Sequence, residues 1–154
     1  MTTATTAALG CTCFKLRKLA RTVSRLYDQH LAAAGLKTTQ YSVLANAARE
    51  ALPVAALAER LGTERTTLTR NLKPLLDAGW LELLPGVDSR QRIVTITDAG
   101  RVKLAAAYVH WRAAQTEFET LMGVDAVREL HGRLDATLAQ VSPLIEDMHH
   151  AHPD

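Results

Sequence analysis

Apolar side chains recur at intervals of three and four residues over most of this chain, which is the spacing of amphipathic helices. The first stretch predicts a helix over about 11–34, and the glycine that follows can end this helix in a left-handed cap. Five further helices are expected in order at about 39–50, 54–61, 64–78, 98–122 and 125–148. The pattern therefore indicates a protein built mainly of helices.

Residue types at the helix starts predict where three of these helices begin. Thr38 or Thr39 would cap the second helix and Thr63 the fourth, because a hydroxyl oxygen accepts a bond from the free amides of the first turn. Pro53 fits the first turn of the third helix, where a missing amide hydrogen costs nothing.

Two segments, 80–84 and 92–97, are rich in apolar and β-branched residues and are predicted as strands. The segment 85–91 between them starts with Pro85-Gly86 and is too long for a two-residue hairpin turn. We therefore expect a hairpin with a polar, basic tip. The expected fold class is mainly α with a small β-hairpin wing.

The composition is that of one folded domain, with or without a helical extension, because 47% of the 154 residues are hydrophobic. No apolar run is long enough for a membrane span, and residues 1–9 lack the regions of a signal peptide, so a cytoplasmic location is expected. No Gly-rich phosphate loop, zinc-spaced Cys/His set or nucleophile elbow occurs, so we expect no catalysis, cofactor or metal. We interpret His149, His150 and His152 as a frayed end in preference to a metal site.

Charge is distributed unevenly, although the formal net charge is only +2. Residues 15–25 carry five cations and no acid, a second basic set lies in the middle of the chain, and residues 117–147 are mostly acidic. A basic centre with an acidic end suits a nucleic-acid reader joined to a separate assembly region, although ordinary solvated helix faces would give the same pattern.

The order of helix, glycine turn, helix and hairpin over 54–97 is that of a winged helix-turn-helix. The helix at 64–78 has an apolar back, formed by Leu68, Leu72 and Leu75, and a polar front that could enter the major groove of DNA. Arginine can donate two bonds to guanine, and threonine can contact a thymine methyl group or a phosphate. The predicted DNA-binding residues are Arg65, Thr66, Thr67, Thr69, Arg70, Lys73, Asp88, Arg90 and Arg92.

Two stretches resemble the MarR family of winged helix-turn-helix transcriptional regulators. The first is Leu57-Ala-Glu-Arg-Leu-Gly-Thr-Glu-Arg-Thr-Thr-Leu-Thr-Arg70, which is similar to the family's helix-turn-helix. The second is Asp88-Ser-Arg-Gln-Arg-Ile-Val-Thr-Ile-Thr-Asp-Ala-Gly100, which is similar to the family's wing. That wing often reads Asp-Arg-Arg, where this chain has Ser89 in the middle. The resemblance implies that Arg90 reaches into a minor groove and that Asp88 steadies this arginine.

The resemblance covers roughly 11–148 and implies a homodimer that binds double-stranded DNA at a palindromic operator. Members typically repress their targets and leave DNA when a small molecule binds or a cysteine is oxidised. The expected layout is a tail at 1–9, a DNA-binding domain at 37–97, a dimerisation region built from 10–36 and 98–148, and a tail at 149–154.

A winged-helix module that binds a protein and never reads DNA is the alternative of another class. The basic residues Arg65, Arg70 and Arg90 favour DNA, because a wing that docks a protein would not need them.

The first helix carries candidates for the signal that such a regulator senses. Cys13, Arg17, Ser24 and Tyr27 fall near one line on this helix, at about 100° per residue. The cysteine and the tyrosine stand at the interval found in the organic-hydroperoxide-sensing branch of the family, which this segment partly resembles, but Arg17 replaces a tyrosine of that branch. A cation beside a thiol favours the reactive thiolate.

Three interpretations of this stripe stay open. Cys13 could be a small buried hydrophobe, or it could be the thiol of an oxidant sensor. Alternatively, Arg17 could hold the carboxylate of a small-molecule effector such as an aromatic acid or a thioester, with Ser24 and Tyr27 lining the site. Cys11 is expected on the far side of the helix, so that a bridge between the two cysteines of one chain is geometrically unfavourable.

Overall fold

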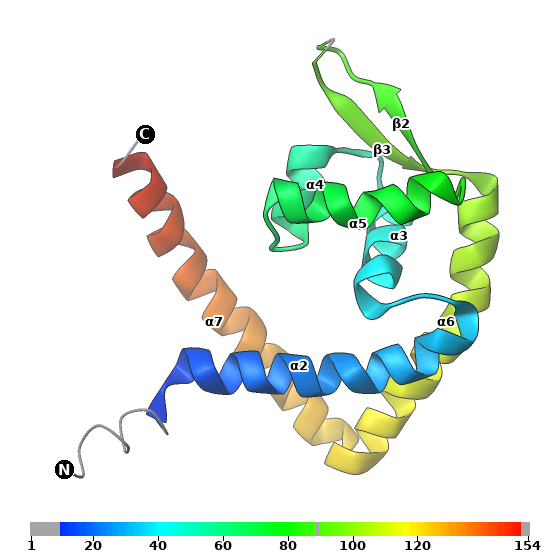
Figure 1. Cartoon of the computed structure of the whole chain (residues 1–154). Coiled ribbons are helices and arrows are strands. Elements are labelled where there is room, and N and C mark those ends of the chain that lie inside the picture. Colours follow the sequence, from blue (N-terminus) through cyan, green and yellow to red (C-terminus); the bar gives the residue numbers. More distant parts are fainter. Residues whose placement is uncertain (1–9, 89, 152–154) are drawn as a thin grey trace. The chain divides into compact units, whose positions relative to one another are not determined.

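The computed structural model describes residues 10–88 and 90–151, with side chains described as far as residue 145. The predicted helices are confirmed, with these bounds (Figure 1): α2 (Thr12–Leu31), α3 (Thr38–Arg49), α4 (Val54–Arg60), α5 (Arg65–Asp77), α6 (Asp98–Met122) and α7 (Val124–Ala151). A 3₁₀ turn, η1 (Ala32–Ala34), follows α2 and ends at Gly35 with a φ of 65°. The tail expected at 1–9 and the side chains of His149, His150 and His152 lie outside what is described, whereas α7 continues three residues past its expected end at 148.

The described residues divide into two compact units, one up to Ala114 and one from Gln115 onward. The first half of α6 belongs to the first unit, because Leu104, Ala107 and Trp111 pack into its core. Within the described residues, no helix is long and apolar enough to cross a membrane.

The sheet has three antiparallel strands in the order β1 (Leu52–Pro53), β3 (Arg92–Ile96) and β2 (Leu81–Pro85). The two longer strands form the predicted hairpin, whose register pairs Leu81 with Ile96 and Pro85 with Arg92. The sequence pattern missed β1, because a strand of two residues is too short to show alternation. Its pairing of Leu52 with Val94 places β3 at the centre of the sheet. Pro53 therefore lies in a strand and at the cap of α4, not in the first turn of that helix as predicted.

Two predicted helix caps are wrong by one residue. The N-cap of α3 is Lys37, whose amide donates to Gln40 Oε1 at 2.9 Å, while the Thr38 amide donates to Asp28 Oδ1 of α2 at 2.7 Å. These side-chain acceptors satisfy the first amides of the helix, so no threonine hydroxyl is needed for that purpose. The N-cap of α5 is Glu64 and not Thr63, so the helix begins at Arg65.

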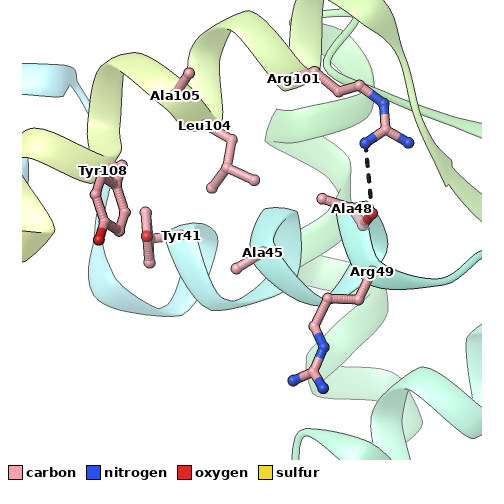
Figure 2. A pocket seen from close by; sticks show the side chains of 8 residues that line it. All are labelled: Tyr41, Ala45, Ala48, Arg49, Arg101, Leu104, Ala105 and Tyr108. Atoms are coloured by element: carbon pink, nitrogen blue, oxygen red, sulfur yellow. Dashed lines mark hydrogen bonds between the residues drawn. The ribbon is translucent and has the colours of Figure 1, made fainter.

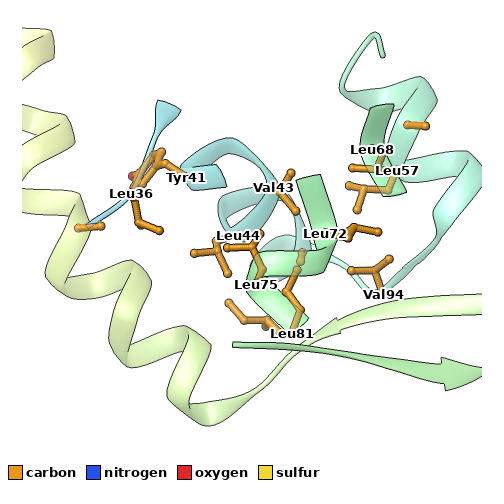
Figure 3. Close-up of a cluster of buried hydrophobic side chains, with 14 of the residues drawn as sticks. Leu36, Tyr41, Val43, Leu44, Leu57, Leu68, Leu72, Leu75, Leu81 and Val94 are labelled. Atoms are coloured by element: carbon orange, nitrogen blue, oxygen red, sulfur yellow. The ribbon is translucent and has the colours of Figure 1, made fainter. Parts of the chain in front are cut away.

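The apolar back of α5 forms the centre of the core (Figure 3). Leu68, Leu72 and Leu75 are buried and belong to one cluster with Leu44 of α3 and Val94 of β3. Burying a leucine side chain contributes about 1.5–3 kcal/mol, so the three leucines hold α5 by one face and leave the other face free. Core packing therefore determines which side of α5 points to solvent.

A tight junction joins the end of α5 to the start of α6. The Thr97 hydroxyl accepts a bond from the Gly100 amide at 3.0 Å, which caps α6, and it donates to the Gly79 carbonyl at 2.6 Å. The backbone of α6 approaches Trp80 so closely that a Cβ built on Gly100 would overlap the Trp80 carbonyl oxygen. The junction thus needs a hydroxyl side chain at position 97 and a glycine at position 100.

Candidate nucleic-acid interface

The solvent face of α5 presents most of the predicted contact residues. Arg65, Thr66, Thr69 and Arg70 are exposed, whereas Thr67 is half-buried at the edge of this face. The Thr69 hydroxyl donates to the Arg65 carbonyl at 2.9 Å, and its oxygen can still accept a further hydrogen bond. This face offers guanidinium donors and threonine methyl groups, the groups that read base edges in a major groove.

The wing places two further arginines, Arg90 and Arg92, in exposed positions. The Asp88 carboxylate accepts a bond from the Arg90 backbone amide at 3.0 Å, and the Asp88 carbonyl accepts one from the Gln91 amide at 2.9 Å. Asp88 therefore shapes the backbone turn that carries Arg90, in the way that Asx turns do. The contact is therefore made to the backbone of Arg90.

A hollow of about 350 Å³ brings the helix and wing sets together. Arg65 and Thr69 of α5 line one side of it, and Asp88, Arg90 and Arg92 of the wing line the other. In the described part of the chain, neither Arg65 nor Arg90 forms an ion pair with a carboxylate. Three guanidinium groups around one hollow make a strong site for a phosphate oxygen, because arginine donates two parallel bonds to such oxyanions.

Lys73 differs from the arginines because its ammonium group is already paired with Asp77 at 2.7 Å. Both side chains are mostly exposed, and an exposed i,i+4 pair contributes only about 0.3–0.5 kcal/mol. A DNA phosphate can replace this carboxylate at small cost, so the pair does not remove Lys73 from the interface.

The candidates on α2 do not form a single site within the described chain. Cys13 and Arg17 line a hollow of about 570 Å³ with Cys11 and Phe14, whereas the half-buried Ser24 lies outside it. Tyr27 is also half-buried and outside the hollow. The remaining lining residues, Lys18 and Arg21, are cations.

Both cysteines are exposed thiols, so within one chain Cys13 is not the buried hydrophobe of one interpretation. The prediction that Cys11 faces the far side of the helix is wrong. Cys11 precedes the first helical residue, with an extended ψ of 114°, and it lines the same hollow as Cys13. The rotation of about 100° per residue, which placed the two cysteines on different sides, does not apply to Cys11 because it lies outside the helix.

A third hollow, which the sequence pattern did not reveal, lies between α3 and α6 (Figure 2). Its volume is about 560 Å³ and its lining residues are Tyr41, Ala45, Ala48, Arg49, Arg101, Leu104, Ala105 and Tyr108. Small alanines on both facing helices leave the space open. The sequence carried one signal of this hollow, because each helix has a tyrosine and an arginine spaced so that they fall on one helix face. Alanine and tyrosine at such spacing also occur in ordinary cores, so the signal does not distinguish a hollow from a core.

Aromatic rings form one end of this hollow, here named the α3–α6 hollow. Tyr41 and Trp111 stack with ring centroids 5.9 Å apart, and Tyr108 and Trp111 stack at 5.7 Å. Burial raises the pKa of Tyr41 above its usual value, and the neighbouring Tyr108 raises it further. Tyr41 therefore keeps its phenol proton through the physiological range and can act as a hydrogen-bond donor.

Comparisons with known proteins point to one family. A sequence model described as the MarR family matches residues 34–91. The transcriptional regulator MosR of M. tuberculosis, solved in complex with DNA, is 34% identical, covers 84% of this chain and 97% of its own, and superimposes with a TM-score of 0.72. No curated protein sequence matches the chain.

More distant structures share the fold. The apo form of MarR from E. coli is 22% identical, with 83% of this chain and 97% of that chain covered and a TM-score of 0.69. CouR from Rhodococcus jostii RHA1, bound to p-coumaroyl-CoA, is 19% identical, with 82% and 91% covered and a TM-score of 0.71. At these identities the likeness concerns the fold alone.

Proposed function

The chain belongs to the MarR family of winged-helix transcriptional regulators, and on this premise we propose that it is a dimeric repressor that leaves a palindromic operator when a small carboxylic acid binds. The observation that carries the DNA-binding part is the hollow where Arg65 of α5 meets Arg90 and Arg92 of the wing. A helix front in the major groove and a wing arginine in the adjacent minor groove would contact DNA together. MosR, the relative at 34% identity, was solved with DNA bound.

The dimer is supported by an apolar seam on α7 that nothing within the described residues covers. Leu134, Leu138, Val141 and Ile145 are exposed at alternating intervals of four and three residues, and Leu138 is 63% exposed. A helix-pairing seam has this spacing. A twofold dimer would bury the seam and would present two recognition helices to successive major grooves, which is why the operator should be an imperfect palindrome.

The effector site is proposed at the α3–α6 hollow in preference to the stripe on α2. Its volume lies in the range of small-molecule sites, one end is aromatic, and Arg49 and Arg101 supply cations to its lining. An aromatic acid or a thioester of one suits this combination of rings and guanidinium groups. CouR, which shares the fold, was solved with such a thioester, p-coumaroyl-CoA.

The test measures DNA binding and release in one titration. Fluorescence anisotropy of a labelled duplex from upstream of the protein's own gene would report binding, and random duplex of equal length gives the non-specific level. Addition of 4-hydroxybenzoate should lower the affinity, whereas neutral 4-hydroxybenzamide should not. Equal affinity for both duplexes would reject sequence-specific binding and would favour a protein-docking module.

A thiol-based oxidant sensor is the second candidate, because Cys11 and Cys13 are exposed and line a hollow with three cations. The thiolate of Cys13 would attack a hydroperoxide, whose O–O bond breaks and releases an alcohol, leaving a sulfenic acid. The Cys11 thiol would then attack that sulfur, so that an S–S bond forms and water leaves. Oxidation of this pair at the start of α2 would alter the packing of the helix.

A further inference from the structure

One hydrogen bond crosses the α3–α6 hollow and joins its two walls (Figure 2). The Arg101 guanidinium Nη1, from the first turn of α6, donates to the carbonyl oxygen of Ala48 at 3.5 Å. Ala48 is the penultimate residue of α3, and the last carbonyls of a helix have no partner within that helix. Arg101 thus caps the end of α3 from a helix that lies 53 residues further along the chain.

The two residues of this contact lead along the chain to two places on strand β3, its middle and its C-terminal end. From Ala48 the chain runs directly into β1, where Leu52 pairs with Val94 of β3. From Arg101 it runs back one turn to Thr97, which follows the last residue of β3 and bonds to the end of α5. The bond between Arg101 and Ala48 therefore closes a ring of contacts around the central strand of the wing.

A carboxylate in the α3–α6 hollow would compete with Ala48 for this guanidinium group. A carboxylate can accept two parallel bonds of about 2.7–2.9 Å from a guanidinium group, and its negative charge adds an attraction that a neutral carbonyl lacks. The existing bond to a neutral carbonyl lies at the long limit of hydrogen-bond geometry. A bound carboxylate should therefore displace the Ala48 carbonyl from the Arg101 guanidinium group.

We propose that Arg101 is both the carboxylate-binding residue of the α3–α6 hollow and the latch that fixes the wing, so that binding of an aromatic acid opens the contact to Ala48 and frees β3. This inference rests on the proposed function, because it assigns the ligand-binding group and the route of release within the same site. It distinguishes Arg101 from Arg49, which lines the same hollow but whose side chain makes no ion pair or hydrogen bond among the residues described here.

Arg101→Gln tests the latch, and Arg128→Gln, at an exposed arginine of α7 that does not line the hollow, is its control. In the absence of ligand, R101Q should bind operator DNA about fivefold or more weakly than the wild type, in the range of ordinary coupling between sites. It should also show faster amide hydrogen exchange in β3, a readout that needs neither DNA nor ligand. The control should keep wild-type DNA affinity and exchange. Circular dichroism and thermal melting confirm that both variants are folded.

The ligand arm uses 4-hydroxybenzoate, with 4-hydroxybenzamide as the neutral probe. R101Q should lose at least about tenfold in affinity for the acid and almost nothing for the amide, because only the charged bond is removed. The latch would be overturned if amide hydrogen exchange in β3 of R101Q were as slow as in the wild type. It would also be overturned if the acid released DNA from R101Q at the concentration that releases it from the wild type. If the acid neither binds the wild-type protein nor releases it from DNA, the proposed effector is wrong. Faster amide exchange in β3 of R101Q would still support the wing latch in that case.

Discussion

The hydroxyl of Thr97 joins the end of the recognition helix to the beginning of α6, because it donates to the Gly79 carbonyl at 2.6 Å and accepts from the Gly100 amide at 3.0 Å. A second bond, from the Thr97 amide to the Trp80 carbonyl at 3.1 Å, strengthens the junction. The Thr97 side chain thus holds the end of the wing, the end of α5 and the start of α6 together.

Removing this hydroxyl should destabilise the fold. Thr97→Ala loses a helix cap and leaves the Gly79 carbonyl without its donor, so we expect the free energy of unfolding to fall by about 1–3 kcal/mol. Thr97→Ser keeps the hydroxyl and should stay within about 0.5 kcal/mol of the wild type. Urea unfolding followed by circular dichroism measures both. Equal losses in the two variants would show that the methyl group matters and the hydrogen bonds do not.

The interface predicts two different kinds of DNA-binding defect. Arg90→Ala should weaken binding to all sequences, and more strongly on A·T-rich flanks, because arginine is drawn to narrow minor grooves. Arg70→Ala and Thr66→Ala should instead relax base preference, each by about 1–3 kcal/mol. Anisotropy titrations against operator and random duplexes separate the two effects, with Arg128→Ala on α7 as a distant control. Identical losses on both duplexes for all three variants would mean that α5 is not the reading helix.

Assembly through α7 predicts a stable dimer in solution. Light scattering at micromolar concentration should give twice the chain mass of 16.8 kDa. Leu138→Asp places a charge on the exposed seam and should yield monomers that bind the operator far more weakly, since each monomer reads only one half-site. Gln140→Asp puts the same charge off the seam and should remain dimeric. A wild-type monomer at this concentration would contradict the prediction.

Oxidant sensing predicts an order of reactivity between the two thiols. Cys13→Ser should bind DNA normally and ignore cumene hydroperoxide, whereas Cys11→Ser should still react but stop at the sulfenic acid. Intact-mass spectrometry should show a loss of two hydrogens in the oxidised wild type and a gain of one oxygen in the Cys11→Ser variant. If neither the wild type nor the variants respond to peroxide and all release DNA with an organic acid, the thiols take no part in sensing.

The sequence predicted α5 and its buried face well, because the leucines of this helix recur at a spacing that only a helix places on one face. It could not reveal β1, since two residues carry no periodicity, although their pairing makes β3 the central strand. The error at Cys11 came from extending helical geometry one residue too far.

The α3–α6 hollow was missed for a different reason. Its walls come from segments about sixty positions apart, and alanine gives no indication in the sequence of whether it fills a core or borders a space. Only the three-dimensional path of α6 past α3 brings Ala45 and Ala105 to face the same volume.

The aromatic stack at the end of this hollow gives the protein an intrinsic optical probe. Trp111 contacts the rings of Tyr41 and Tyr108, and both tyrosines line the hollow. The only other indole of the chain is Trp80, which lies 4.5 Å from the Lys103 ammonium group. In a Trp80→Phe variant, the emission of a single tryptophan would change as a ring entered between the helices. Metabolite libraries could then be screened by native fluorescence, without a label and without knowledge of the operator.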